Sequence, residues 1–96
     1  MKTYLIAHIE VINSELMDKY REQVPKIVAK YQGKYLVRGG DSEIIEGDYF
    51  RHRIVLLEFP NRQIANDFYN SEDYAPLKKL RIAAGNNSSV IVEGVE

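Results

Sequence analysis

The 96-residue sequence predicts one α+β domain, residues 1–96, in which strands and helices alternate in the order strand, helix, strand, strand, helix, strand. Two observations lead to this fold class. Apolar residues recur at every second position in the expected strands and at every third or fourth position in the expected helices. Glycine, proline and asparagine fall between these segments, where they favour turns and helix ends.

The first half begins with a strand over residues 3–11, rich in apolar and β-branched residues. Asn13 or Ser14 caps the helix that follows, because either side chain can accept a bond from its first turn. Apolar positions spaced by three and four continue to Tyr31, with Pro25 inside the pattern, where we expect a kink. Gln32 and the glycine after it end this helix in the left-handed conformation.

The middle of the chain predicts two strands joined by an irregular connection. Residues 34–38 form the second strand, and Gly39-Gly40 allows a bulge or sharp bend after it. Residues 43–46 then resume an extended course, and Gly47-Asp48 turns the chain into the longest strand, residues 51–59.

The last third predicts helices and a final strand. Pro60-Asn61 stops the third strand and caps a second helix, and Ser71 caps a further short helix. Pro76 and Gly85 bracket the last helical piece, and residues 89–95 form the fourth strand. This βαββαβ order is the ferredoxin-like split motif, with an antiparallel sheet covered by helices on one side.

Alternation sorts the strand residues into two faces, and both faces are largely apolar. The helix-covered face is expected to hold Leu5, Ala7, Ile9, Tyr35, Val37, Val55, Leu57, Phe59, Val90 and Val92. The opposite, open face takes Tyr4, Ile6, His8, Leu36, Arg38, His52, Ile54, Leu56, Glu58, Ile91 and Glu93. An apolar patch of this size is typical of an interface, so we expect a homodimer formed sheet to sheet.

Composition excludes several classes of partner and cofactor. Thirteen basic residues against 14 acidic ones, without charge blocks, argue against binding to nucleic acid or to an anionic membrane. No apolar stretch approaches the roughly 20 residues that span a bilayer. The absence of cysteine suits a reducing cytoplasm, where we place the protein. Neither a metal-ligand spacing nor a phosphate-binding glycine motif is present, so we expect no metal and no cofactor.

Four short motifs occur in the order typical of one family: GKYLVRGG at residues 33–40, Glu46-Gly47, LEFP at residues 57–60 and FYNSEDY at residues 68–74. The chain resembles domain-of-unknown-function family 1330, small bacterial proteins of the dimeric α/β-barrel type, over essentially its whole length. The resemblance implies a ferredoxin-like subunit and a homodimer whose two sheets enclose a barrel-like interior. It implies no particular reaction.

Polar groups on the open face form the first candidate site. His8, Arg38 and Glu58, together with Glu93, stand among aliphatic side chains and need partners there. They form either a structural ion-pair network or a ligand site. In the second case Arg38 binds a carboxylate or other small anion, and His8 with Glu58 transfers a proton, because antiparallel pairing can bring the two together.

Aromatic residues after the second helix form a second candidate set. Tyr20 and Tyr69 are more typical of core aromatics, and Asn70 of a helix junction. Tyr74 and Arg81 are expected at the mouth of a cleft, where a ligand-binding role is open to them and to Tyr69.

Two functions remain open at this point. The protein is either a metal-free enzyme acting on an organic acid or aromatic metabolite, or a non-catalytic module that binds a ligand or assembles with other proteins. A connected cavity with a converging histidine and arginine favours the enzyme, and a packed seam favours the structural role.

Overall fold

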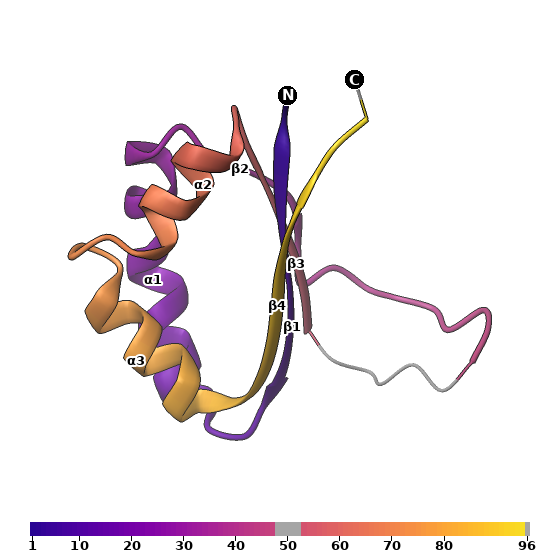
Figure 1. Cartoon of the computed structure of the whole chain (residues 1–96). Coiled ribbons are helices and arrows are strands. Elements are labelled where there is room, and N and C mark those ends of the chain that lie inside the picture. The colour runs from indigo at the N-terminus through magenta and orange to yellow at the C-terminus, as the bar shows by residue number, and fades with distance from the viewer. Residues whose placement is uncertain (48–52, 96) are drawn as a thin grey trace.

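The structure is a computed structural model and describes residues 1–47 and 53–95. It has an α+β, ferredoxin-like arrangement with helices on one face of an antiparallel sheet (Figure 1). The described elements are β1 (Thr3–Val11), α1 (Ser14–Lys30), β2 (Lys34–Arg38), β3 (Arg53–Phe59), α2 (Arg62–Tyr69), α3 (Ala75–Ala84) and β4 (Gly85–Glu93). The strand order across the sheet is β2-β3-β1-β4. None of the helices within the described ranges is long and apolar enough to cross a membrane.

Side-chain caps and a left-handed residue set the helix ends where the sequence predicts them. The Asn13 side chain accepts a bond of 3.1 Å from the backbone N–H of Leu16 and so begins α1. Asn61 begins α2 in the same way. The first helix continues through Pro25 and ends before Gln32, whose φ of 62° is left-handed.

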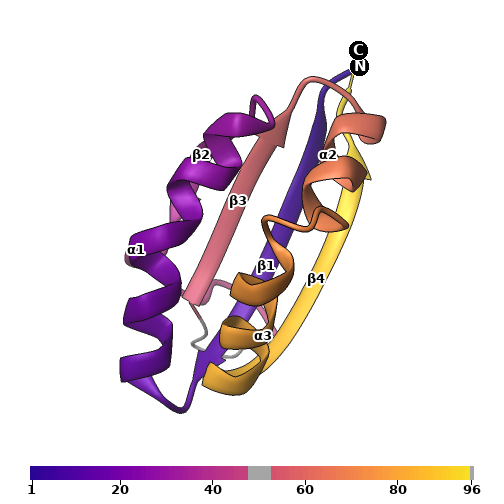
Figure 2. The same cartoon turned by 90° about the vertical axis from the view of Figure 1, so that its left-hand side faces the viewer.

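The connection between α2 and α3 differs from the predicted short helix. The hydroxyl of Ser71 donates to the carbonyl of Phe68 and accepts from the N–H of Tyr74, at 2.8 and 3.1 Å. These bonds close a turn, and α3 starts only at Ala75. Ser71 therefore caps the turn between α2 and α3. The two helices follow one another over β1 and β4 (Figure 2).

A bulge in β2 corrects the predicted facing of its residues. Tyr35 pairs with Leu57 and Val37 pairs with Leu56, so Leu36 is an extra residue in this strand. After the bulge Arg38 pairs with Val55, on the helix-covered face. The prediction of Arg38 on the open face is therefore wrong, because simple alternation cannot count the extra residue.

The last strand begins earlier than predicted, and its pairing with β1 places its residues on the faces opposite to those predicted. It starts at Gly85, packed so tightly that an added Cβ would lie 1.9 Å from the carbonyl oxygen of Glu10. In the resulting register Ile91 pairs with Leu5 on the helix-covered face, and Val90 is exposed on the open face. Glu93 also lies on the helix side, where it pairs with Arg62. The predicted facing of residues 90–93 is therefore wrong, because the pairing of β4 with β1 sets it.

The segment after β2 leaves the sheet on the side away from the helices (Figure 1). Gly39 turns the chain with a φ of 68°, and residues 43–46 form no strand, contrary to prediction. Ile45 in this segment is 89% exposed. The predicted turn residue Asp48 and the start of the third strand, with His52, lie outside the described residues.

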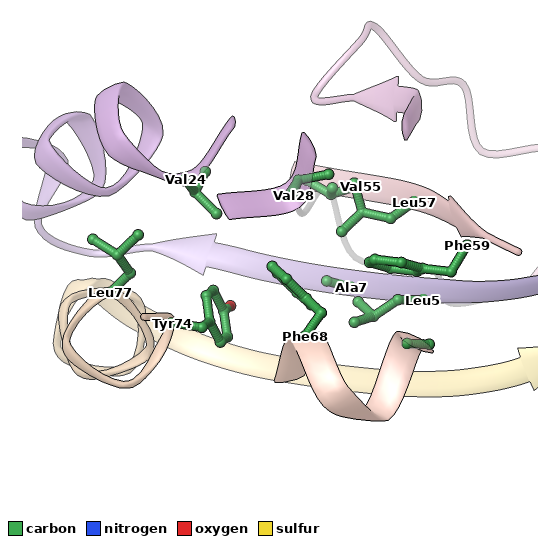
Figure 3. Close-up of a cluster of buried hydrophobic side chains, with 11 residues drawn as sticks. Leu5, Ala7, Val24, Val28, Val55, Leu57, Phe59, Phe68, Tyr74 and Leu77 are labelled. Atoms are coloured by element: carbon green, nitrogen blue, oxygen red, sulfur yellow. The ribbon is translucent and has the colours of Figure 1, made fainter. Parts of the chain in front are cut away.

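Buried side chains from the strands and helices form one main core (Figure 3). Phe68 of α2 lies at its centre, with its ring 5.3 Å from that of Phe59 and 4.6 Å from that of Tyr74. Its other members are Leu5, Ala7, Val24, Val28, Val55, Leu57, Ala65 and Leu77. The opposite face of the sheet carries no helix in the described structure, and Leu36, Val37, Val90 and Val92 are exposed there in a single chain.

Candidate functional site

A small cavity lies within the core, between the helices and the sheet. Leu5, Ala7 and Ile9 of β1 form part of its floor, and aromatic residues of the helices form its walls. A water-sized sphere can occupy about 30 Å³ of this inner cavity, room for about two waters. An outer basin of about 510 Å³ shares three of its lining residues, so the two compartments meet.

The strand register explains why the inner cavity forms at this point. Arg38, Val55, Ala7 and Ser89 occupy one row across the four strands, on the helix-covered face. Ala7 and Ser89 have short side chains and fill little of the space beneath the helices. The row therefore has an arginine at the β2 edge, a shallow apolar floor and a hydroxyl at the β4 edge.

Arg81 of α3 forms the inner polar end of the cavity and is 4% exposed. Its guanidinium donates to the hydroxyl of Tyr74 at 3.2 Å and to the side-chain carbonyl of Asn87 at 3.0 Å, with Tyr69 at 3.5 Å. These acceptors are all neutral, and no ion pair between described residues includes Arg81. Burial opposes its charge, but the tyrosine hydroxyls outweigh burial and raise the pKa of Arg81.

Two tyrosines connect the inner arginine to the first helix. The hydroxyls of Tyr20 and Tyr74 lie 2.9 Å apart in a shared hydrogen bond. Burial, and then the neighbouring Tyr74, raise the pKa of Tyr20 above its ordinary value. Tyr20 therefore keeps its proton at neutral pH and acts as a hydrogen-bonding group, not as a base.

Three arginines meet where the inner cavity opens into the outer basin. Arg21, Arg38 and Arg53 line both compartments. Burial, and then the charges of the other two arginines, lower the pKa of Arg53. Asp18 forms an ion pair with Arg21, and Glu22 also lines the basin. The mouth thus carries three cations against two carboxylates.

Arg38 covers the mouth with an exposed side chain. It donates a bond of 2.8 Å to the backbone carbonyl of Arg21, and its guanidinium lies 4.8 Å from the centre of the Tyr35 ring. Both contacts are with neutral groups. An anion arriving from the basin would offer this guanidinium a charged, bidentate acceptor instead.

The structure brings together four residues that the sequence analysis divided between two sites. Arg38, Tyr69, Tyr74 and Arg81 all line the inner cavity. The bulge in β2 is responsible, because it turns Arg38 toward the helices. Binding of a ligand by these residues stays a prediction.

The predicted proton-transfer pair lies on the other face of the sheet and is not a pair. His8 is opposite Ile54 and Ser88, and Glu58 is opposite Tyr4 and Lys34. Four residues along the strand separate the two positions, roughly 13 Å. The expectation that antiparallel pairing brings His8 near Glu58 is therefore wrong.

Glu58 has a different partner, Lys2, at 2.9 Å. The hydrogen bond from Lys2 holds the pKa of Glu58 below its ordinary value, so the carboxylate is a weak base at neutral pH. The Glu93 carboxylate, expected in the same network, pairs with Arg62 on the helix side.

Some cavity residues were missed or assigned only to the core. The sequence pattern singles out neither Arg21 nor Arg53, and it places Tyr20 and Tyr35 in the core, whereas all four line the cavity. A signal for Arg21 exists, because it follows Tyr20 and lies four residues after Met17, whose side chain is buried. No sequence signal identifies Arg53, since its role depends on where β2 and β3 pair.

The fold and the cavity define a class: a ferredoxin-like α+β subunit with a pocket between its helices and its sheet. The model of the family named domain of unknown function (DUF1330) matches residues 2–95. The chain belongs to this family. A comparison with curated proteins gives no match.

Solved structures with low sequence identity share the fold. A protein of unknown function from Rhodopseudomonas palustris is 13% identical with a TM-score of 0.79, over 99% of this chain and 83% of that one. A dimeric ferredoxin-like protein of unknown function from Jannaschia sp. CCS1 is 12% identical with a TM-score of 0.72, over 98% of this chain and 100% of that one. An antibiotic biosynthesis monooxygenase is 15% identical with a TM-score of 0.58, over 98% of this chain and 99% of that one. At these identities the likeness concerns the fold alone.

Proposed function

We propose that this protein binds a small organic anion at the arginine mouth of the cavity between its helices and its sheet. The observation that carries the proposal is the meeting of Arg21, Arg38 and Arg53 where the cavity opens. Burial, and then the charges of Arg21 and Arg38, lower the pKa of Arg53. A carboxylate placed among them would relieve this repulsion and satisfy the planar guanidinium of Arg38.

A metal-free enzyme acting on an organic acid or aromatic metabolite is the second candidate. The likeness in fold to an antibiotic biosynthesis monooxygenase favours it. Against it, the described residues that line the inner cavity include no carboxylate and no imidazole. A protein base for proton transfer is thus missing among them, and His8 with Glu58 would need a site on the other face. Ligand binding is therefore the better supported function.

The proposal is tested by calorimetric titration of the purified protein with acetate and benzoate. Wild type should bind at least one of these acids, and Arg38→Gln should weaken binding about tenfold or more, the range expected for a charge-assisted bond. Arg62→Gln is the matched control, because Arg62 is an exposed arginine on α2 paired with Glu93. Equal binding by Arg38→Gln and wild type would refute the proposal.

We also propose that two copies associate through the open face of the sheet. Leu36, Val37, Val90 and Val92 are between 38% and 54% exposed there in a single chain. Solved proteins of the same fold are described as dimeric, from Jannaschia sp. CCS1 among others, which supports a homodimer here. A second copy offers the matching apolar surface.

A further inference from the structure

We infer that the ligand is an elongated aromatic carboxylic acid with an oxygen at the end far from its carboxylate. Its carboxylate binds Arg38 and Arg53 at the mouth, its ring lies over Ala7, and its far oxygen reaches the hydroxyl of Tyr74. This inference rests on the proposed anion site and adds the body and the orientation of the ligand.

The length of the row of strand residues beneath the cavity favours an elongated molecule. Arg38 and Ser89 stand at the two ends of one row across four strands, and three strand spacings give roughly 14 Å between their backbones. Both residues line the same cavity. A ligand that contacts both ends must therefore be longer than a simple two-carbon acid.

The two ends of the cavity suit different chemical groups of a ligand. The mouth holds charges that repel one another and have an open basin of about 510 Å³ in front of them, which suits a carboxylate. The inner end holds the buried cation Arg81, which donates to neutral acceptors, and the linked hydroxyls of Tyr20 and Tyr74. Such a cluster suits a neutral or partly negative oxygen, as in a phenol or ketone.

The middle of the cavity is apolar and aromatic. Its floor is Ala7 with Val55, and the rings of Tyr35, Phe68 and Tyr74 stand around it. Aromatic rings pack edge to face or offset-stacked against another flat ring, with about 4.5–7 Å between ring centres. A planar aromatic body therefore fits this space better than a branched or highly charged one.

Arg38 controls admission to the inner cavity. The cavity now has about 30 Å³ of open space, too little for a ring, so the ring needs side chains at the mouth and along the cavity to move. Arg38 is exposed, and among the described residues its side chain contacts the carbonyl of Arg21 and the ring of Tyr35. A carboxylate that binds Arg38 would draw it from these contacts and open the mouth for its own ring.

The test compares acetate, cinnamate and 4-hydroxycinnamate by calorimetric titration. Wild type should bind 4-hydroxycinnamate about fivefold more tightly than cinnamate, the value of roughly one hydrogen bond, and both more tightly than acetate. Tyr74→Phe should remove the preference for the hydroxyl compound and leave cinnamate unchanged.

Filling the cavity separates this inference from the proposed function. Ala7→Leu should weaken both aromatic acids at least tenfold and leave acetate unchanged. If Ala7→Leu does not fold, Ser89→Leu replaces it, because Ser89 lies at the other end of the row. Ser88→Leu is the matched control for Ser89→Leu, because Ser88 lies on the opposite face of the sheet. Aromatic binding that survives both cavity variants would overturn the inference while leaving the anion site intact. No binding of any acid by wild type would overturn both.

Discussion

Arg81 is a charged residue placed where a charge is costly, and this sets what its removal should do. It is 4% exposed, and its acceptors among the described residues are all neutral. Burying an ion without a counter-ion costs several kcal/mol, and apolar replacements of similar size are often neutral or stabilising. A residue kept for ligand binding at the expense of stability fits this pattern.

We therefore predict that Arg81→Met unfolds at a free energy within about 1 kcal/mol of wild type, or above it, and no longer distinguishes 4-hydroxycinnamate from cinnamate. Urea denaturation and titration measure the two effects. A loss of about 3–5 kcal/mol would instead identify Arg81 as a structural residue, since this is the usual cost of breaking a needed buried charge network.

The Tyr20 hydroxyl provides a second prediction for a single residue. Tyr20→Phe removes one half of the 2.9 Å bond to Tyr74 and keeps the ring that packs against it. We expect a loss of about 1 kcal/mol in the free energy of unfolding, measured by urea denaturation. Because Tyr20 keeps its proton through the neutral range, this loss should not change between pH 6 and 9. A loss that varies with pH in this range would contradict the assignment.

At the scale of elements, the sequence was sufficient for the order of strands and helices and insufficient for the facing of two strands. Burial of one face makes apolar residues recur at every second position in a strand and at every third or fourth position in a helix. These patterns therefore identify β1, α1 and β3 directly. The bulge at Leu36 is set by how β2 pairs with β3, which no local pattern records. One extra residue was enough to move Arg38 to the other face.

The early start of β4 has a similar cause. The residue types of Asn86-Asn87-Ser88 favour a turn, but these residues lie in a strand. The side chain of Asn87 accepts a hydrogen bond from the Arg81 guanidinium and donates to the backbone carbonyls of Arg81 and Gly85. Tertiary contacts thus decided the structure of this segment. Of the candidate site, the residues Arg38, Tyr69, Tyr74 and Arg81 were identified from sequence, but their common location was not.

The bulge leads to a prediction about β2. Deleting Leu36 should leave Tyr35 and Arg38 in their present pairs with Leu57 and Val55, because Leu36 is the extra residue. We expect the deletion variant to fold and to bind 4-hydroxycinnamate within about threefold of wild type. Deletion of Leu56, which has partners on both sides, is the control and should prevent folding. Loss of binding without loss of folding in the first variant would show that the bulge itself shapes the mouth.

At the scale of the whole molecule, the helices cover one face of the sheet and leave the other uncovered (Figure 1). The corrected register makes the open face more apolar than predicted, since Val90 and Val92 replace Ile91 and Glu93 there. A chain of 96 residues buries a modest fraction of its surface, so a covering copy adds stability.

We predict that light scattering at micromolar concentration gives about twice the chain mass of 11.1 kDa for wild type. Leu56→Glu should give a monomer of lower thermal stability, because it places a charge in an apolar contact. Ile82→Glu is the control, since Ile82 is 56% exposed on the helix layer, and it should stay a dimer. A wild-type monomer, or a dimer that tolerates Leu56→Glu, would contradict the proposed interface.

The inner cavity and the open face lie on opposite sides of one sheet, and this separation has a consequence for how an assembled pair would respond to its ligand. In a sheet-to-sheet dimer the two cavities face outward, and both cavities are complete without help from the other chain. Occupancy of one should leave the affinity of the other unchanged, so saturation should follow a simple hyperbola with a Hill coefficient of about 1. Leu56→Glu subunits should then bind 4-hydroxycinnamate as tightly as the paired ones do.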